Sequence, residues 1–347
     1  MIEDQATQDR VVRFLASAAS STGAELLCFE MLRGGAVQLN YRIDVHFFDG
    51  PFAGIQELVL RTDSASKLVE SRGRSEEFRI QRFVYEAGVR VAEPLWLCED
   101  TRVIGKDFYI MRWIPGSAWG PEIVAYAAQE KCGDAIVSAL GSELARLHAV
   151  SFNTPGTEFI GALDNSPSRY RLSEAQDAIA DLSVAQPVLE WGLRWLYRTA
   201  PAHEVLVLAH RDFRTGNYML SDGKLTGLLD WEFSGWSDPH EDIGWFCARC
   251  WRFGRDNCEA GGIAFREIFY RAYEERSRHQ VDSEKVFWWE VFAHLRWAII
   301  AIQQGERFSR DGESSLDLAL TNRCVAEISY ELLGMIAPSV SQMAASG

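Results

Sequence analysis

The sequence lacks any apolar run that approaches the length of a membrane span, and it does not open with the basic, apolar and small-residue order of a signal peptide. We therefore expect no membrane-spanning segment. Basic residues are also few, because 35 Lys and Arg stand against 49 Asp and Glu, which gives a formal net charge of −14. A field of this sign repels nucleic acid and anionic membrane surfaces, so we expect neither as a partner.

Cysteines are scarce and odd in number, and most of them lie within apolar stretches. The seven cysteines indicate free, mostly buried thiols in a reducing cytoplasm rather than a disulfide framework. Cys247 and Cys250, with Cys258 beyond them, have a spacing that also occurs in zinc and redox sites, but no second pair or His-x-His cluster stands nearby. Structural thiols within a buried helix over Ile243–Phe253 are the favoured interpretation, and a metal site is the alternative.

The composition indicates a folded protein with room for more than one core. The chain has 347 residues, of which 47% are hydrophobic, and it includes 12 Trp and 19 Phe. This content could fill one large core or two unequal ones, and the length favours two. The sequence contains no internal repeat and no low-complexity tract.

The first third of the chain shows the short apolar runs and turn residues of a sheet, with one helix inside it. The helix is predicted from a one-sided apolar pattern that ends at Gly88. The expected strands are Glu25–Leu32, Tyr41–Phe48, Ile55–Arg61, Leu95–Cys98 and Phe108–Ile114, and the expected helix is Ser75–Ala87.

Beyond a break near Trp113–Ser117 the pattern turns helical. The expected helices are Ala135–His148, Leu172–Thr199, His240–Phe253, Ile263–Arg278, Ser283–Gln304 and Leu316–Leu333. One strand-rich island, Val205–Asp230, interrupts them. The chain is therefore predicted to be α+β, with a small antiparallel-sheet lobe in residues 1–114 and a large, mainly helical lobe in residues 115–347.

The island carries three polar residues in an order that suits phosphoryl transfer. Asp212, Asn217 and Asp230 are placed on short, glycine-punctuated loops beside strands. Phosphoryl transfer needs little covalent help from a protein, but it needs phosphates held by magnesium and an aligned attacking hydroxyl. Asn217 and Asp230 offer the oxygen ligands that Mg²⁺ prefers, and Asp212 could accept the hydroxyl proton. Taken one at a time, each is also a common turn residue.

The segments His-Arg-Asp-Phe-Arg-Thr-Gly-Asn, starting at His210, and Leu-Leu-Asp-Trp-Glu, around Asp230, resemble the catalytic loop and metal-binding aspartate of the aminoglycoside phosphotransferase and choline kinase group, relatives of protein kinases. The resemblance implies a two-lobed protein-kinase-like fold. It implies Asp212 as catalytic base, His210 as the support of its loop, and Asn217 and Asp230 as Mg²⁺ ligands. It also implies ATP or GTP as phosphate donor and a small hydroxylated acceptor. Arg211 departs from the group, whose members usually have Gly there.

The segment after Asp230 favours small-molecule kinases over protein kinases. Asp-Trp-Glu stands in place of Asp-Phe-Gly, and a helix expected near Pro239 leaves no room for a long activation loop. Asp242, on that helix, is expected to brace the catalytic loop by accepting backbone N–H groups. His148 is interpreted as a structural histidine. A protein kinase is the less favoured alternative.

The resemblance also implies a phosphate-covering turn and an adenine pocket in the first lobe. Gly34 and Gly35 stand where a glycine-rich turn covers the phosphates, and Val37-Gln38 replaces the usual Ser-Asn that follows. The hinge backbone is expected to read the base edge. The residues expected to line the adenine pocket are Met111, Arg112, Trp113 and Ile114.

The cation on the third strand is predicted to be Arg61, where kinases generally have Lys. Glu77, or less favourably its neighbour Glu76, is the acid expected to orient it. The alternative for both acids is a solvated first helical turn, which the helix dipole favours. Arg61 is shared with many members of the branch that this chain resembles, the kinase domains related to acyl-CoA dehydrogenases.

The acceptor is predicted from a second cluster of arginines. Arg249, Arg252 and Arg255 are interleaved with Trp251 and Phe253 at the end of a helix that begins soon after Asp230. They are expected to bind a carboxylate- or phosphate-bearing alcohol, and the branch resemblance suggests a hydroxy acid or its CoA ester. The alternative is that these cations offset the helix dipole or pair with surface acids.

A nucleotide-binding module without turnover, resembling a pseudokinase, is the alternative to an active kinase. The altered glycine turn and Arg61 favour that alternative, whereas the intact set of Asp212, Asn217 and Asp230 disfavours it.

Overall fold

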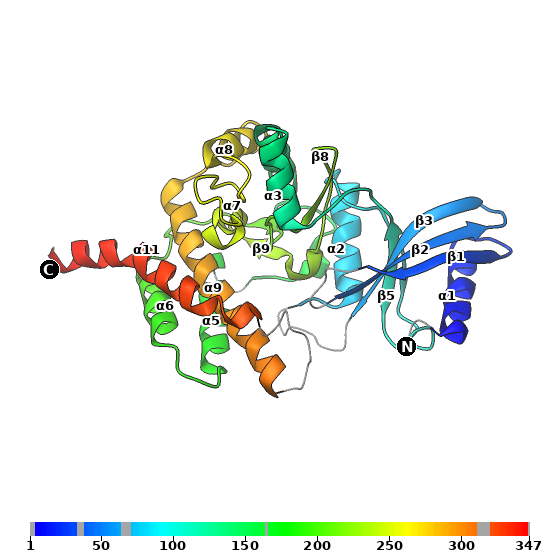
Figure 1. Ribbon diagram of the computed structural model, residues 1–347, viewed down its shortest axis with the longest axis horizontal. Helices are drawn as coiled ribbons and strands as arrows, with labels where there is room; N and C mark the ends of the chain where they lie inside the picture. Colours follow the sequence, from blue (N-terminus) through cyan, green and yellow to red (C-terminus); the bar gives the residue numbers. More distant parts are fainter. Residues whose placement is uncertain (1–3, 33–37, 64–70, 164–165, 311–319, 346–347) are drawn as a thin grey trace. The chain divides into compact units, whose positions relative to one another are not determined.

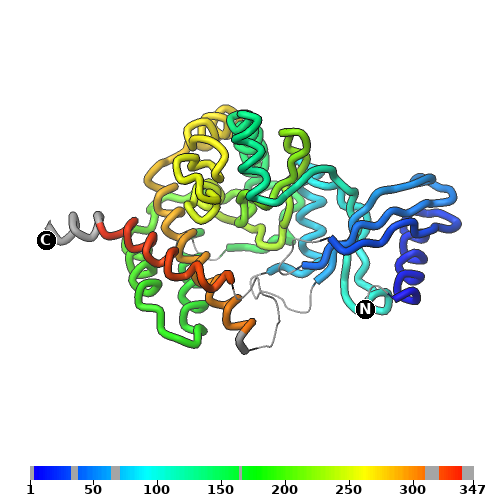
Figure 2. Tube along the Cα trace, viewed as in Figure 1, coloured from blue at the N-terminus to red at the C-terminus, as the bar shows by residue number. Residues whose placement is uncertain are grey.

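The computed structural model describes residues 4–32, 38–63, 71–163, 166–310 and 320–345 of the chain. By backbone contacts the chain divides into two compact units. The sheet unit comprises Met1–Trp119 and Gly216–Ser234, and the helical unit comprises Gly120–Thr215 and Gly235–Gly347. Figure 2 traces the chain in colours that follow its sequence. The lobe boundary predicted after residue 114 stays a prediction, because a division by backbone contacts does not show which segments of the chain fold as one domain.

The sheet unit is built on one five-stranded antiparallel sheet in the order β1-β2-β3-β5-β4 (Figure 1). All five expected strands and the expected helix are present, with small shifts at their ends. The elements are α1 (Gln5–Ala18), β1 (Ala24–Met31), β2 (Gln38–Phe47), β3 (Gly54–Asp63), α2 (Arg74–Glu86), β4 (Pro94–Cys98) and β5 (Phe108–Arg112).

The alternation of side chains along β3 gives the sheet two differently covered faces. Leu58 and Leu60 belong to a buried cluster that includes Val11 and Leu15 of α1. Because successive side chains of a strand point to opposite faces, Arg61 lies on the other face, where its guanidinium contacts α2. Helix α1 was not predicted from the sequence, and it covers the first of these faces.

A hairpin and a short 3-10 helix from later in the chain complete the sheet unit. The hairpin consists of β7 (Tyr218–Ser221) and β8 (Lys224–Leu228), and η2 (Trp231–Phe233) follows it. The hairpin is hydrogen-bonded to the segment between α2 and β4, since Leu228 N donates to Arg90 O over 2.8 Å. Two segments that are distant in sequence are therefore packed into one unit.

The helical unit is built mainly from α-helices. They are α3 (Gly120–Gln129), α4 (Gly133–His148), α5 (Pro167–Ala180), α6 (Pro187–Thr199), α7 (Pro239–Cys247), α8 (Arg266–Glu274), α9 (Ser283–Arg310) and α11 (Val325–Ala345). Two short strands, β6 (Val207–Ala209) and β9 (Gly235–Ser237), pair antiparallel, and the 3-10 helices are η1 (Glu158–Ile160) and η3 (Arg249–Trp251). Helices α5, α6, α9 and α11 enclose one large apolar cluster.

Three of the predicted helices are wrong in extent. The helix expected over Leu316–Leu333 corresponds to α11, which begins at Val325 and ends at Ala345. The helix expected over Leu172–Thr199 is two helices, because Pro187 opens α6 at its first turn and a residue before proline is disfavoured from helical geometry. The helix expected over His240–Phe253 ends at Cys247, and Phe253 adopts a left-handed conformation with φ +49°. The sheet and the helices together confirm the predicted α+β class. None of the described helices combines the length and the apolar character that crossing a membrane requires.

Candidate functional site

The two predicted magnesium ligands lie at the same end of the β7–β8 hairpin. Asn217 immediately precedes β7, and Asp230 follows β8 by two residues. The hairpin is antiparallel, and Leu229 N donates to Asn217 O over 2.8 Å. The backbone pairing therefore brings the amide and the carboxylate to one open end. Asp230 adopts a left-handed conformation with φ +67°, which Asp tolerates better than most residues do.

Oxygen donors of this kind fit Mg²⁺ chemically. Among the residues that the structure describes, no group of three or more His, Cys, Asp or Glu side chains is arranged to hold a metal. A magnesium ion at the hairpin end would thus take one carboxylate and one amide from the protein. Phosphate and water oxygens would complete its coordination, which is the usual manner of Mg²⁺ in nucleotide sites.

Arg61 bridges two acids of the sheet unit. Its Nη2 lies 2.8 Å from Oε1 of Glu77 and 2.5 Å from Oδ1 of Asp230. Although burial alone would lower the pKa of Arg61, the charges of Glu77 and Asp230 raise it, so the guanidinium stays protonated. The cation on the third strand and the acid on α2 are thus in contact, whereas the side chain of Glu76 is half-exposed and lies 3.8 Å from Arg72.

Two further residues of this buried network were not predicted from the sequence. The side chain of Arg74 is fully buried and pairs with Glu77, with Asp63 at 2.8 Å and with Glu232 at 3.5 Å. Burial, together with the nearby Asp230 carboxylate, raises the pKa of Glu232 to about 7. Arg74 gives no sequence signal of its own, since an arginine in a first helical turn is ordinarily solvated.

Ser71 and Gln38 also belong to this network. Ser71 Oγ donates to Oε2 of Glu232 over 2.5 Å, and Gln38 Nε2 donates to the same oxygen. Glu232 therefore receives hydrogen bonds from two neutral donors. The sequence signal that could have identified Glu232 is its place two residues after Asp230.

The loop that carries Asp212 belongs to the helical unit and is braced by Asp242 from α7. Oδ2 of Asp242 accepts from His210 N over 2.7 Å, and Oδ1 accepts from Arg211 N over 2.7 Å. His148 Nε2 lies 3.0 Å from Oδ2 of the same carboxylate, and all of these side chains except that of Arg211 are fully buried. The predictions that Asp242 braces the loop and that His148 is structural are confirmed.

The backbone at Arg211 adopts a conformation that glycine tolerates better than any other residue. Its φ is +62°, a left-handed conformation that costs a non-glycine residue about 1 kcal/mol or more. An ion pair of the Arg211 side chain offsets part of this cost, since Nη2 lies 3.3 Å from Oε2 of Glu174 on α5. Its carbonyl accepts from Arg296 Nη1 over 2.5 Å. The loop therefore holds a strained residue through contacts on both its backbone and its side chain.

Asp212 itself is buried and receives two hydrogen bonds within the helical unit. Trp245 Nε1 donates to Oδ1 over 2.8 Å, and Arg214 Nε donates to the same oxygen over 3.2 Å. The guanidinium of Arg214 also lies 4.6 Å from the centroid of the Trp251 ring. Neither Trp245 nor Arg214 was singled out from the sequence, because their relation to Asp212 depends on how α7 packs against the loop.

The predicted adenine-binding segment ends strand β5. Arg112 N donates to Glu93 O over 2.9 Å, and Trp113 N donates to Glu57 O over 3.0 Å. These two backbone donors are thus engaged within the sheet. Met111 Sδ accepts from Gln81 Nε2 at 3.4 Å, and a Cβ on Gly227 would come within 2.7 Å of Ile114 Cδ1. That the segment lines an adenine pocket stays a prediction.

The predicted phosphate-covering turn and acceptor arginines have different outcomes. Gly34 and Gly35 lie outside the described residues. Arg249 pairs with Asp256 at 2.7 Å and with Glu331 at 3.1 Å. Arg252 donates to Cys247 O over 2.7 Å and to Asp256 O over 2.9 Å. Both guanidinium groups are therefore engaged within the chain: Arg252 caps the C-terminal end of α7, and Arg249 pairs with two acids.

The cysteines near this cluster behave as structural thiols. Cys247 is fully buried at the end of α7, and burial raises the pKa of its thiol to about 12. Cys250 lies on η3, where burial also raises its pKa. All seven cysteines of the chain are free.

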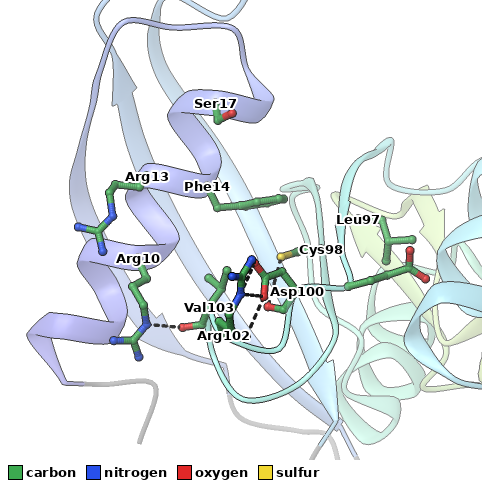
Figure 3. Close-up of a pocket in the computed structure, with 10 residues that line it drawn as sticks. Arg10, Arg13, Phe14, Ser17, Leu97, Cys98, Asp100, Arg102 and Val103 are labelled. Atoms are coloured by element: carbon green, nitrogen blue, oxygen red, sulfur yellow. Dashed lines mark hydrogen bonds and ion pairs between the residues drawn. The ribbon is translucent and has the colours of Figure 1, made fainter.

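A hollow of about 600 Å³ lies elsewhere in the sheet unit, between α1 and the turn after β4 (Figure 3). Phe14 points from α1 toward Cys98, and Arg10 Nε donates to Val103 O over 2.8 Å (Figure 3). Arg102 and Asp100 pair with each other at 2.7 Å. The lining includes none of the residues predicted for phosphate transfer.

Comparison with known families gives an independent result. A model described as the phosphotransferase enzyme family matches residues 32–283. That range contains Asn217 and Asp230 at the hairpin end, the loop of Asp212 and the Arg61–Glu77 pair. The chain is also similar to acyl-CoA dehydrogenase family member 10 of Mus musculus, with 32% identity over 197 residues that cover 55% of this chain and 18% of the relative. The chain thus spans less than a fifth of that relative's length.

Two solved structures share the fold. One is a Ralstonia eutropha protein assigned as an aminoglycoside phosphotransferase, with a TM-score of 0.73, 19% identity and coverage of 95% of this chain and 98% of that one. The other is the ternary complex of streptomycin, ATP and aminoglycoside phosphotransferase (2″)-IIa, with a TM-score of 0.59, 15% identity and coverage of 90% and 95%. These likenesses confirm the predicted kinase-like, two-lobed fold class.

Proposed function

Because this chain belongs to the phosphotransferase enzyme family, we propose that it transfers the γ-phosphate of ATP or GTP to a hydroxyl group of a small molecule. The family resemblance predicted from the Asp212 loop and from Asp230 is thereby confirmed. The observation that carries the proposal is the ordered set of Asp212, Asn217 and Asp230 within the matched range. The ATP complex of a protein with the same fold supports the choice of donor.

We assign a separate task to each residue of that set. Asp212 accepts or aligns the proton of the attacking hydroxyl, and His210 supports its loop. Asn217 and Asp230 hold Mg²⁺, which when bound neutralises charge on the nucleotide phosphates. Arg61, oriented by Glu77, supplies a further cation to the phosphates.

The acceptor that we propose is a hydroxy acid or its CoA ester. The similarity to an acyl-CoA dehydrogenase family member supports this class, although the relative is more than five times longer than the matched segment. Arg249 and Arg252 remain candidate anion-binding residues, but each would have to exchange a contact within the chain for the acceptor. The cytoplasm, inferred from the free cysteines, is the proposed location of the activity.

A screen of ADP release over a panel of hydroxylated metabolites tests the proposal with purified protein and Mg·ATP. The panel should contrast hydroxy acids and their CoA esters with choline and an aminoglycoside. Preference for the two cationic acceptors would refute the anionic acceptor class while leaving the kinase proposal intact. Magnesium-dependent nucleotide binding without ADP release for any acceptor would instead favour the module without turnover.

Two variants then separate the roles of base and metal ligand. Asp212→Asn is expected to leave nucleotide affinity nearly unchanged and to lower kcat by on the order of 10²- to 10⁴-fold. Asp230→Ala is expected to weaken binding of the magnesium nucleotide itself, measured by calorimetry with and without Mg²⁺. Full turnover by Asp212→Asn on the best acceptor would show that Asp212 is not the base.

A further inference from the structure

The proposed base, Asp212, is held from one side by an indole. Trp245 lies on α7, and its Nε1–H donates to Oδ1 of Asp212 over 2.8 Å. Trp245 is 3% exposed and Asp212 is 6% exposed, so little water competes for this contact. Arg214 supplies a charged contact to the same oxygen at 3.2 Å, whereas the indole adds an N–H that orients the carboxylate without adding a further charge.

The ring of Trp245 is itself fixed from two sides. Its centroid lies 5.4 Å from that of Trp251, and the guanidinium of Arg296 on α9 lies 4.7 Å from it. The same guanidinium donates to the carbonyl of Arg211, the residue before Asp212. One arginine on α9 thus contacts both the indole and the loop that the indole serves.

The backbone of α7 is held close enough to α9 to leave the indole little freedom. A Cβ on Gly244 would lie 2.7 Å from Cβ of Trp289 and 3.0 Å from the backbone N of Glu290. Real Cβ atoms essentially never approach another atom within 3.0 Å, so this crossing requires glycine. Glycine at 244 therefore sets the helix separation that places the next residue, Trp245, against Asp212.

We propose that Trp245 is a positioning residue for phosphoryl transfer and acts through Asp212. The inference rests on the proposed function. Trp245 and Arg214 both donate to Oδ1, and these two contacts fix the orientation in which the carboxylate meets the acceptor hydroxyl. As the hydroxyl oxygen bonds to the γ-phosphorus, its proton passes to Asp212, and the nucleoside diphosphate leaves with the electron pair of the broken P–O bond.

The test compares Trp245→Phe with Trp289→Phe. Both residues are buried tryptophans of the helical unit, but Nε1 of Trp289 has no hydrogen-bond partner among the described residues. The control thus removes an indole N–H that binds nothing. ADP release from Mg·ATP is measured with the best acceptor of the panel and with water alone. We expect Trp245→Phe to lower kcat about 10- to 100-fold, with nucleotide Kd unchanged, and Trp289→Phe to leave kcat within about twofold.

A double-mutant cycle distinguishes positioning from a general structural role. If Trp245 acts through Asp212, adding Trp245→Phe to Asp212→Asn should cause little further loss of kcat. Equal losses in both backgrounds, or a kcat for Trp245→Phe equal to that of the control, would overturn the inference and leave the proposed function standing. Absence of ADP release from the wild-type protein with every acceptor would overturn the proposed function, and the inference with it.

A second measurement covers the case in which Trp245→Phe does not fold. Replacement of Trp245 by benzothienylalanine keeps the shape of the indole and substitutes sulfur for the N–H, so the same loss of kcat is expected. In ¹⁵N-tryptophan NMR spectra, Asp212→Asn should shift the indole peak of Trp245 and leave that of Trp289 in place. A Trp245 peak that does not respond would show that the hydrogen bond is absent in solution.

Discussion

Replacing Asp242 by Asn should both destabilise the protein and release the loop that carries Asp212. The carboxylate accepts from the backbone N–H groups of His210 and Arg211, one on each oxygen, at 2.7 Å. Asn keeps one acceptor oxygen and presents an NH₂ group to the other donor. One hydrogen bond to a charged group is lost, worth about 1.5–3 kcal/mol, and a buried N–H is left without an acceptor, which costs about 1–3 kcal/mol.

The sum predicts a loss of about 2.5–6 kcal/mol in the free energy of unfolding, a large part of the stability of an ordinary domain. Urea denaturation followed by circular dichroism measures it. A matched control is Asp256→Asn, since the pair of Asp256 with Arg249 is half-exposed and should contribute less than about 1 kcal/mol. A loss for Asp242→Asn no larger than that of the control would refute the bracing role.

The pH dependence gives a second check on the same residue. Burial by itself would raise the pKa of Asp242, but the hydrogen bond and charge of His148, together with His210, lower it below 3.8. A carboxyl group whose pKa is lowered on folding contributes stability that is present above its unfolded pKa and is lost as the pH falls through the folded pKa. The stability difference between wild type and Asp242→Asn should therefore shrink below about pH 4. A difference that stays constant from pH 7 to the acid transition would contradict this assignment.

Two further variants probe the buried network of the sheet unit. Arg61→Lys keeps the charge but loses the fork that reaches both Glu77 and Asp230, so we expect the Kd for Mg·ATP to rise about tenfold in calorimetry; an unchanged Kd would show that the fork is dispensable. Arg74→Met leaves buried carboxylates without one of their cations and should cost about 3–5 kcal/mol in urea denaturation. A cost below about 1 kcal/mol would mean that Arg61 alone balances Glu77 and Glu232.

The strands and the local loops could be predicted because their signals are short in sequence. The short apolar run in Ile55–Arg61 predicts β3, and the order of Asp212, Asn217 and Asp230 predicts phosphoryl transfer. Helix α1 was missed because its burial rests on few positions, with Val11 and Leu15 one turn apart and fully buried. A pattern this sparse does not separate a packed helix from an exposed one.

The supporting contacts of the site could not be predicted, because they join residues that are distant in the chain. Trp245 and Asp212 are 33 residues apart, and their hydrogen bond depends on where α7 crosses α9. Arg74 meets Glu232 only after the hairpin β7–β8 and η2 have packed into the sheet unit. Sequence spacing indicates the residues that we propose for the chemistry, whereas the residues that contact and hold them are determined by tertiary packing.

The two arginines that depart from the family pattern are each matched by acids in their own unit. Arg61, in place of the usual Lys, contacts Glu77 and Asp230. Arg211, in place of the usual Gly, adopts a strained backbone, and its side chain reaches Glu174. A buried arginine without an acid is costly, so these contacts stabilise both side chains in the fold. The acids that contact Arg61 and Arg211 show that the fold accommodates both arginines, and the Arg61→Lys titration tests whether Arg61 acts on the nucleotide.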